Sequence, residues 1–131
     1  MSGATFSVLD PLYPPERQVI YLDVSRPRGI IVLQRAIEEA GPLAKVVNDF
    51  VVQTLELRVQ IPALELLDDG TLIGGTVNGE DCLEEQASYK TYMPDILVGP
   101  DSTPTLSFTS GSEGRPKGVK GRHYSLAYYF D

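Results

Sequence analysis

LSFTSGSEGRPKGV, residues 106–119, carries the strongest signal for the fold of this chain. From Thr109 to Gly118 it holds three hydroxyl residues, three glycines and one lysine. Glycines let backbone N–H groups approach an anion closely, and hydroxyls donate further hydrogen bonds to it. A lysine at the far end supplies a compact charge for phosphate oxygens. The stretch predicts a loop that binds a nucleoside triphosphate, with these candidate contact residues: Thr109, Ser110, Gly111, Ser112, Gly114 and Lys117.

Two other phosphate-binding motifs do not fit these residues. A P-loop needs Gly-Lys-Ser/Thr, which is absent, and Pro116 stands where its helix would have to begin. The glycines at 111, 114 and 118 do not give the G-x-G-x-x-G spacing of a dinucleotide-binding fold. A Ser/Gly-rich loop without a ligand stays an alternative, although the Pro-Lys-Gly ending and the preceding strand argue against it.

The segments on either side of this loop predict a strand, a hairpin and a helix. Residues 105–109 are typical of a strand, residues 118–121 of a tight strand or hairpin, and residues 123–130 of a helix. The chain stops at Asp131 inside an apolar segment, whereas domain boundaries usually fall in exposed polar linkers. We therefore expect the chain to be a fragment.

Further toward the amino terminus, the pattern predicts an α/β fold. Prolines at 11, 14 and 15 precede a helix expected over residues 16–25, with Val19, Tyr21 and Leu22 facing inward and Pro27 ending it. The apolar run of residues 29–33 predicts a strand buried on both faces, as in a parallel sheet covered by helices.

The middle of the chain predicts another helix and a strand pair. A helix is expected from about Pro42 to Thr54, and its inward positions would be Leu43, Val46, Val47, Phe50 and Val51. Alternation from Leu57 predicts a strand toward Leu66, followed by a turn at residues 68–70 and a short partner strand at residues 72–73. Residues 74–93 show weak periodicity, so we expect a loop with one short helical piece.

Composition and charge exclude several classes of protein. With 42% hydrophobic and 22% charged residues, the chain is typical of a globular cytoplasmic protein. A net charge of −7 disfavours nucleic-acid binding. Cys82 and His123 are the single cysteine and histidine, so neither a disulfide within the chain nor a Cys/His zinc site can form. No stretch has the length and apolarity of a membrane span.

The loop also carries a family resemblance. Residues 106–119 resemble the phosphate-binding motif of the adenylate-forming superfamily, which includes acyl-CoA synthetases, luciferases and peptide synthetase adenylation domains. The usual aromatic-Thr-Ser-Gly-Thr-Thr-Gly-x-Pro-Lys-Gly is met except at Ser112 and Glu113. Glu113 removes one hydroxyl, and its carboxylate would repel phosphate unless it faces Mg²⁺ or Arg115.

Within the superfamily, the Ser-Glu-Gly variant and the following residues 121–126 resemble the fungal aminoadipate reductases. Residues 6–18, 27–29 and 98–102 also resemble that family, so the likeness spans nearly the whole chain. It implies an incomplete AMP-binding (adenylation) domain over residues 1–131, an α/β amino-terminal subdomain with a mostly parallel sheet flanked by helices.

The resemblance also implies an activity. These reductases use ATP and Mg²⁺ to activate L-2-aminoadipate as the acyl adenylate, transfer it to a phosphopantetheine thiol, and reduce it with NADPH to the semialdehyde in lysine biosynthesis. In that family residues 109–117 would contact the ATP phosphates, whereas phosphopantetheine and NADPH belong to the full-length parent. The substrate pocket, the adenine and ribose contacts and the catalytic lysine come later in such domains, so we expect this chain alone to be inactive and to hold no catalytic residue and no metal site of its own.

Two alternatives remain open at this point. The chain is an adenylation fragment for another carboxylic or amino acid, or it is a nucleotide-binding or regulatory remnant without catalysis. An incomplete sheet would leave an edge unpaired, which predicts self-association. Among single residues, His123 is expected to be structural, Tyr13 and Arg17 to pack and pair at the surface, Cys82 to be inert, and the tyrosines at 124, 128 and 129 to lie in the core.

Overall fold

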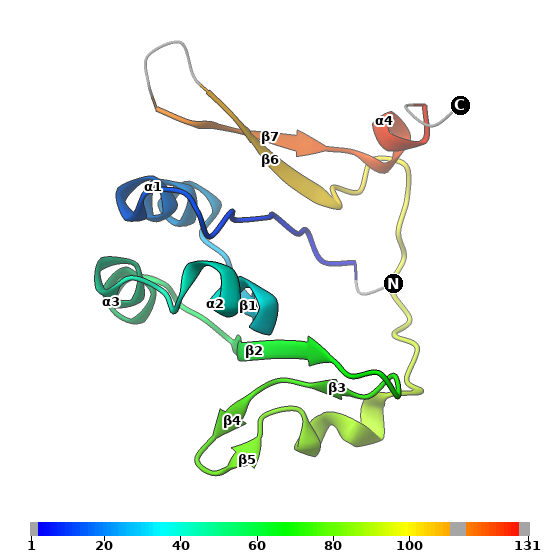
Figure 1. Cartoon of the computed structure of the whole chain (residues 1–131). Coiled ribbons are helices and arrows are strands. Elements are labelled where there is room, and N and C mark those ends of the chain that lie inside the picture. The colour runs from blue at the N-terminus through cyan, green and yellow to red at the C-terminus, as the bar shows by residue number, and fades with distance from the viewer. Residues whose placement is uncertain (1–2, 111–114, 129–131) are drawn as a thin grey trace.

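The computed structural model describes residues 3–110 and 115–128 of the chain (Figure 1). Helices and strands alternate in its first half, and a β-hairpin and a short helix close its second half. In chain order the elements are α1 (Pro15–Ser25), β1 (Gly29–Leu33), α2 (Gln34–Ala40), α3 (Lys45–Thr54), β2 (Val59–Leu66), β3 (Leu72–Ile73), β4 (Thr76–Val77), β5 (Glu80–Asp81), the 3-10 helix η1 (Glu84–Tyr89), β6 (Thr105–Thr109), β7 (Lys117–Gly121) and α4 (His123–Ala127).

Prolines bound α1 on both sides, as the sequence predicts. Pro14 precedes the helix and Pro15 is its first residue, where a missing backbone N–H costs nothing. Before Pro27, Arg26 turns into the left-handed region with φ of 45° and donates its backbone N–H to the Leu22 carbonyl. The buried Gln18 side chain donates from Nε2 to the carbonyls of Pro11 and Tyr13, so the approaching segment is tied to the helix.

A core of four buried side chains joins α1 and α3, which lie side by side in Figure 1. These side chains are Leu22, Val47, Val51 and Leu55. The helix over α3 is confirmed, but it begins at Lys45 rather than Pro42. The inward position predicted for Val46 is wrong, because its side chain is 50% exposed while Val47 beside it is fully buried.

The first sheet has the order β1-β2-β3. β1 and β2 are parallel, with Gly29 opposite Val59 and Ile31 opposite Ile61, whereas β3 returns antiparallel to β2 after the predicted turn. At that turn the Asp69 carboxylate accepts a hydrogen bond from the Thr71 backbone N–H, which lowers the pKa of Asp69. The α/β class is confirmed, and its parallel part in the described residues is the β1–β2 pair and a bridge between Phe6 and Thr105.

The prediction that β1 is buried on both faces is wrong. Ile30 packs against the helical core, but Ile31 and Leu33, which point the other way, are 57% and 54% exposed. Helices α1 and α3 therefore cover one face of this strand, since successive side chains of a strand alternate between its faces. Among the described strands β1 pairs with β2 alone, so the self-association predicted for an unpaired edge stays a prediction.

One helix and one small hairpin were not expected from the sequence. Helix α2 follows β1 directly, buries no side chain, and carries exposed pairs such as Arg35 with Glu39. β4 and β5 form a small hairpin in the segment expected to be mostly loop. Its turn is Asn78-Gly79, both with positive φ, which is the commonest signal for a two-residue hairpin and was missed. The short helical piece expected in the same segment is confirmed as η1.

Gly75 lies where the chain passes from β3 to β4, and we expect its replacement to destabilise the fold. Its φ is +90°, and a Cβ there would lie 2.9 Å from the Ala63 Cβ and 3.1 Å from the Ala63 nitrogen. Gly75→Ala should lower the free energy of unfolding by about 1–3 kcal/mol, measured by urea titration. Gly79→Ala is the matched control, because Gly79 has a similar φ of +92° with nothing within 4 Å. An equal loss in both variants would contradict the steric part of this prediction.

A separate sheet is formed by the antiparallel hairpin of β6 and β7, which confirms the strands predicted around the phosphate motif. The Phe6 carbonyl accepts from the Leu106 N–H at 2.9 Å, and the Phe6 N–H donates to Pro104, so the amino-terminal segment lies beside β6. Helix α4 follows at His123. Among the described residues no helix is both long and apolar enough to cross a lipid bilayer.

Candidate functional site

The β6–β7 hairpin brings two predicted phosphate contacts together from either side of the motif. Thr109 ends β6 and Lys117 begins β7, and the two are direct partners in the antiparallel register. Side chains of such partners lie on the same face of a hairpin. Ser110 follows Thr109 directly, at the same end of the hairpin. The hydroxyl and ammonium groups of this pair therefore stand at the mouth of the loop.

The other predicted contacts are Gly111, Ser112 and Gly114, and they lie outside the described residues. The site is therefore described from its two stems: Thr109 and Ser110 on the β6 side, and the segment from Arg115 to Gly118 on the β7 side. Lys117 is exposed, so its ammonium group is accessible to a ligand.

Helix α1 packs against both stems of this hairpin. The Tyr21 ring stacks on the Phe108 ring, with centroids 4.3 Å apart and planes within 8°. Phe108 is the register partner of Gly118, and a Cβ on Gly118 would lie 3.6 Å from the Val24 side chain. The helix thus covers the strand pair immediately before the loop.

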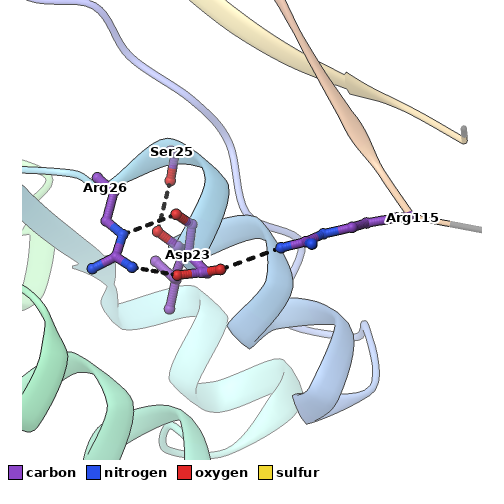
Figure 2. A network of polar contacts seen from close by, with 5 residues as sticks. Asp23, Ser25, Arg26 and Arg115 are labelled. Atoms are coloured by element: carbon purple, nitrogen blue, oxygen red, sulfur yellow. Dashed lines mark hydrogen bonds and ion pairs between the residues drawn. The ribbon is translucent and has the colours of Figure 1, made fainter.

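A second contact between α1 and the hairpin is ionic (Figure 2). The Asp23 carboxylate accepts from the Arg26 guanidinium at 2.6 Å through Oδ1 and from the Arg115 guanidinium at 3.4 Å through Oδ2. Figure 2 shows Arg115 reaching from the hairpin toward Asp23 on α1. The sequence did not indicate Asp23 or Tyr21 as part of this region.

These ion pairs decide which cations of the basic segment 115–122 stay available. In the sequence no carboxylate opposes this segment, but in the structure Arg115 pairs with Asp23 and Arg122 pairs with Asp101. Lys117 and Lys120 form no ion pair within residues 3–110 and 115–128. Of these two lysines, Lys117 is the one at the loop.

An open cleft of about 400 Å³ lies beside β6, between this strand and residues 6–13. Its lining includes the aromatic side chains of Phe6, Tyr13, Tyr21 and Phe108. Among the described residues that line it, Asp10 is the one with a charge, and the Asp10 carboxylate already accepts from the Leu12 N–H. A negative, aromatic lining does not suit phosphate, so the hairpin mouth is the better candidate for the triphosphate.

A model of the AMP-binding enzyme family matches residues 1–130 of this chain. The chain belongs to the AMP-binding enzyme family. The match takes in every element described above, from α1 to α4.

Several curated relatives are similar to this chain over nearly its whole length, among them three L-2-aminoadipate reductases. The L-2-aminoadipate reductase large subunit of Penicillium chrysogenum is 61% identical over 129 residues, which is 98% of this chain. The L-2-aminoadipate reductases of Schizosaccharomyces pombe and Saccharomyces cerevisiae are 57% and 54% identical, each over 99% of it. Each match takes in 9% of the relative, so the chain spans about 9% of the length of these proteins.

The ATP of an AMP-binding enzyme fits the hairpin mouth chemically. Lys117 offers a cation for the outer phosphates, while Thr109 and Ser110 offer hydroxyl donors on the opposite stem. A cation bound with the nucleotide would be held mainly by phosphate oxygens. In the described parts of the chain, no three His, Cys, Asp or Glu side chains gather into a metal site.

The remaining single-residue predictions have mixed outcomes. Arg17 donates from Nε to the Tyr21 hydroxyl at 2.9 Å and lies 4.3 Å above the Tyr13 ring, which confirms the packing expected for Tyr13 and Arg17. The core position predicted for Tyr124 and Tyr128 is wrong, because they are 52% and 69% exposed. Tyr129 lies outside the described residues.

Tyr124 of α4 and Tyr128, which directly follows α4, pack on each other rather than on a core. Their ring centroids are 4.9 Å apart, and the hydrogen bond of the Tyr124 hydroxyl to Tyr128 favours the protonated form and so raises the pKa of Tyr124. Their spacing of four residues predicts that the two side chains lie next to each other, and they do. The spacing does not predict what packs against them.

Proposed function

We propose that this chain is the phosphate-binding part of an ATP-dependent adenylating reductase that acts on L-2-aminoadipate. The observation that carries the proposal is Lys117 held opposite Thr109 at the hairpin mouth, in a chain 61% identical to a reductase of that name. The adenylating role follows from membership of the AMP-binding family, and the substrate from the names of the relatives.

In this proposal the hairpin binds the triphosphate of ATP while the carboxylate of the acid attacks the α-phosphate. Pyrophosphate leaves and the acyl adenylate forms. Lys117 offsets negative charge on the outer phosphates, and the hydroxyls of Thr109 and Ser110 donate to phosphate oxygens. Transfer of the acyl group to phosphopantetheine and reduction by NADPH belong to the full-length reductase in this proposal. The part of this chain that the structure describes, residues 3–110 and 115–128, would take part in binding ATP and orienting its phosphates.

The test is a graft into a complete relative. Residues of this chain replace the matching 129 residues of the Penicillium chrysogenum reductase large subunit. We expect aminoadipate-dependent ATP–pyrophosphate exchange within about tenfold of the unmodified enzyme, a change of about 1.4 kcal/mol in the barrier. The chain on its own is the companion sample, and we expect no exchange from it, because it spans 9% of the reductase.

The outcomes separate the alternatives. A graft that melts like the unmodified enzyme but shows no exchange would contradict the proposal and favour a non-catalytic remnant. A graft that exchanges with another carboxylic or amino acid, and not with aminoadipate, would contradict the substrate assignment. Exchange by the isolated chain would contradict the expectation that it is inactive.

A further inference from the structure

Asp23 connects α1 to the loop across 92 residues of sequence. It lies near the end of α1, on the same turn as Leu22 and Val24, and its side chain is one-third exposed. Its two carboxylate oxygens are divided between two arginines: Oδ1 accepts from Arg26, and Oδ2 accepts from Arg115. Figure 2 shows this carboxylate between the two guanidinium groups.

Arg26 holds the Asp23 side chain in the orientation that Arg115 needs. The Arg26 Nη2 is 2.6 Å from Oδ1, and the Arg26 Nε donates to the Asp23 backbone carbonyl at 3.0 Å. Arg26 itself is placed by its left-handed conformation at the end of the helix, where its backbone N–H bonds to Leu22. Because one guanidinium thus bonds both Oδ1 and the backbone carbonyl of Asp23, Oδ1 is held on the Arg26 side and Oδ2 is left for Arg115.

Arg115 stands two residues before Lys117, on the β7 stem. The β6 stem is fastened separately, by the stack of Tyr21 on Phe108. The two stems are therefore fixed to the same helix by two different contacts, one aromatic and one ionic. The ionic contact is the nearer one to Lys117 along the chain.

We propose that Asp23 is a positioning residue for ATP binding. It holds Arg115 against α1 and thereby sets the direction in which the Lys117 side chain points from the start of β7. Arg115 then serves as an anchor of the stem and not as a phosphate ligand. This inference rests on the proposed function, since it assigns Lys117 to the triphosphate. Asp23 touches no substrate in this arrangement and acts through Arg115.

Asp23→Asn and Arg115→Gln in the grafted reductase test the proposal. Exposed ion pairs have modest effects, so we expect each variant to raise the KM for ATP about two- to fivefold, with the KM for aminoadipate unchanged. The double variant should be no worse than either single one, because both remove the same contact. Asp23→Glu keeps a carboxylate and should keep the KM for ATP near that of the unsubstituted graft.

The matched control is Asp101→Asn, which breaks the other exposed Asp–Arg pair of this segment, between Asp101 and Arg122. It should leave the KM for ATP unchanged. The effect of Asp23→Asn should also shrink in about 0.5 M salt, since exposed charges are screened there. A lower KM for ATP in Asp23→Asn would overturn the proposal, because Asp23 would then be withholding Arg115 from phosphate.

Hydrogen exchange of the backbone amides in residues 117–121 is the readout that does not need activity. We expect faster exchange there in Asp23→Asn and Arg115→Gln, and no change in Asp101→Asn. Unchanged exchange in the first two variants would overturn the positioning role. Faster exchange with an unchanged KM for ATP would also overturn it. A graft without any activity contradicts the proposed function. In that case, amide hydrogen exchange in residues 117–121 still tests by itself whether Asp23 holds this stem in place.

Discussion

Lys117→Ala in the grafted reductase is expected to lower aminoadipate-dependent ATP–pyrophosphate exchange about 100-fold, the scale seen when one preorganised charge-stabilising group is removed. Lys117 is exposed at the start of β7, opposite Thr109, and forms no ion pair with the described residues. Its truncation therefore leaves no unpaired carboxylate behind. A loss of exchange activity then reports the loss of a contact between Lys117 and ATP. The measurement is the rate of exchange at saturating and at limiting ATP.

Lys120→Ala is the matched control for this prediction. Lys120 lies on the same strand, is also exposed, and pairs in register with Leu106, on the opposite face from Lys117. We expect less than about a twofold change from Lys120→Ala, because surface substitutions away from a site have small effects. Equal losses in both variants would contradict a specific phosphate contact and would indicate a general effect of net charge.

Tyr21→Ala is expected to lower the free energy of unfolding of the chain by about 3–5 kcal/mol, the range for removing a large buried aromatic side chain. Tyr21 is 5% exposed, stacks on Phe108, and meets the Tyr13 ring edge-on at 5.6 Å. Its loss leaves a cavity where α1 meets the hairpin. Urea titration followed by circular dichroism measures the change.

Tyr21→Phe separates the ring from the hydroxyl. It keeps the stack on Phe108 and removes the hydrogen bond that the hydroxyl accepts from Arg17, so we expect a loss of about 1 kcal/mol. If Tyr21→Ala and Tyr21→Phe cost the same, the stack does not fasten α1 to the hairpin. In the grafted enzyme, Tyr21→Ala should also raise the KM for ATP, because the β6 stem loses its contact with the helix.

Local rules were enough for the elements whose ends carry strong signals. Pro14 and Pro15 open α1, and the residue before Pro27 leaves the helical region. The predicted turn at residues 68–70 is present because Gly70 has a positive φ there. Helix α2 could not be predicted in this way: none of its side chains is buried, so it has no apolar period to detect.

Burial was predicted less well than the elements themselves. Periodicity places Val46, Ile31 and the tyrosines of α4 on a helix or strand face, but it does not state which neighbour covers that face. Val46 is half exposed because α3 turns Val47 and Val51 toward α1 instead. Tyr124 and Tyr128 pack on each other at the exposed end of α4.

The sequence by itself determined the phosphate motif, its flanking strands and its family, because hydroxyls, glycines and a lysine at short spacing are a local property of the chain. Only the tertiary structure decided that Asp23 and Tyr21 belong to the same region. Arg115 and Lys117 are both cations of the same short segment in the sequence. In the structure Arg115 forms an ion pair with Asp23, whereas Lys117 forms none with the described residues. That difference depends on a carboxylate 92 residues away, brought within 3.4 Å by the packing of α1 on the hairpin. The strength of an ion pair depends on the distance between the two charges in space, and the spacing of residues along the sequence does not give that distance.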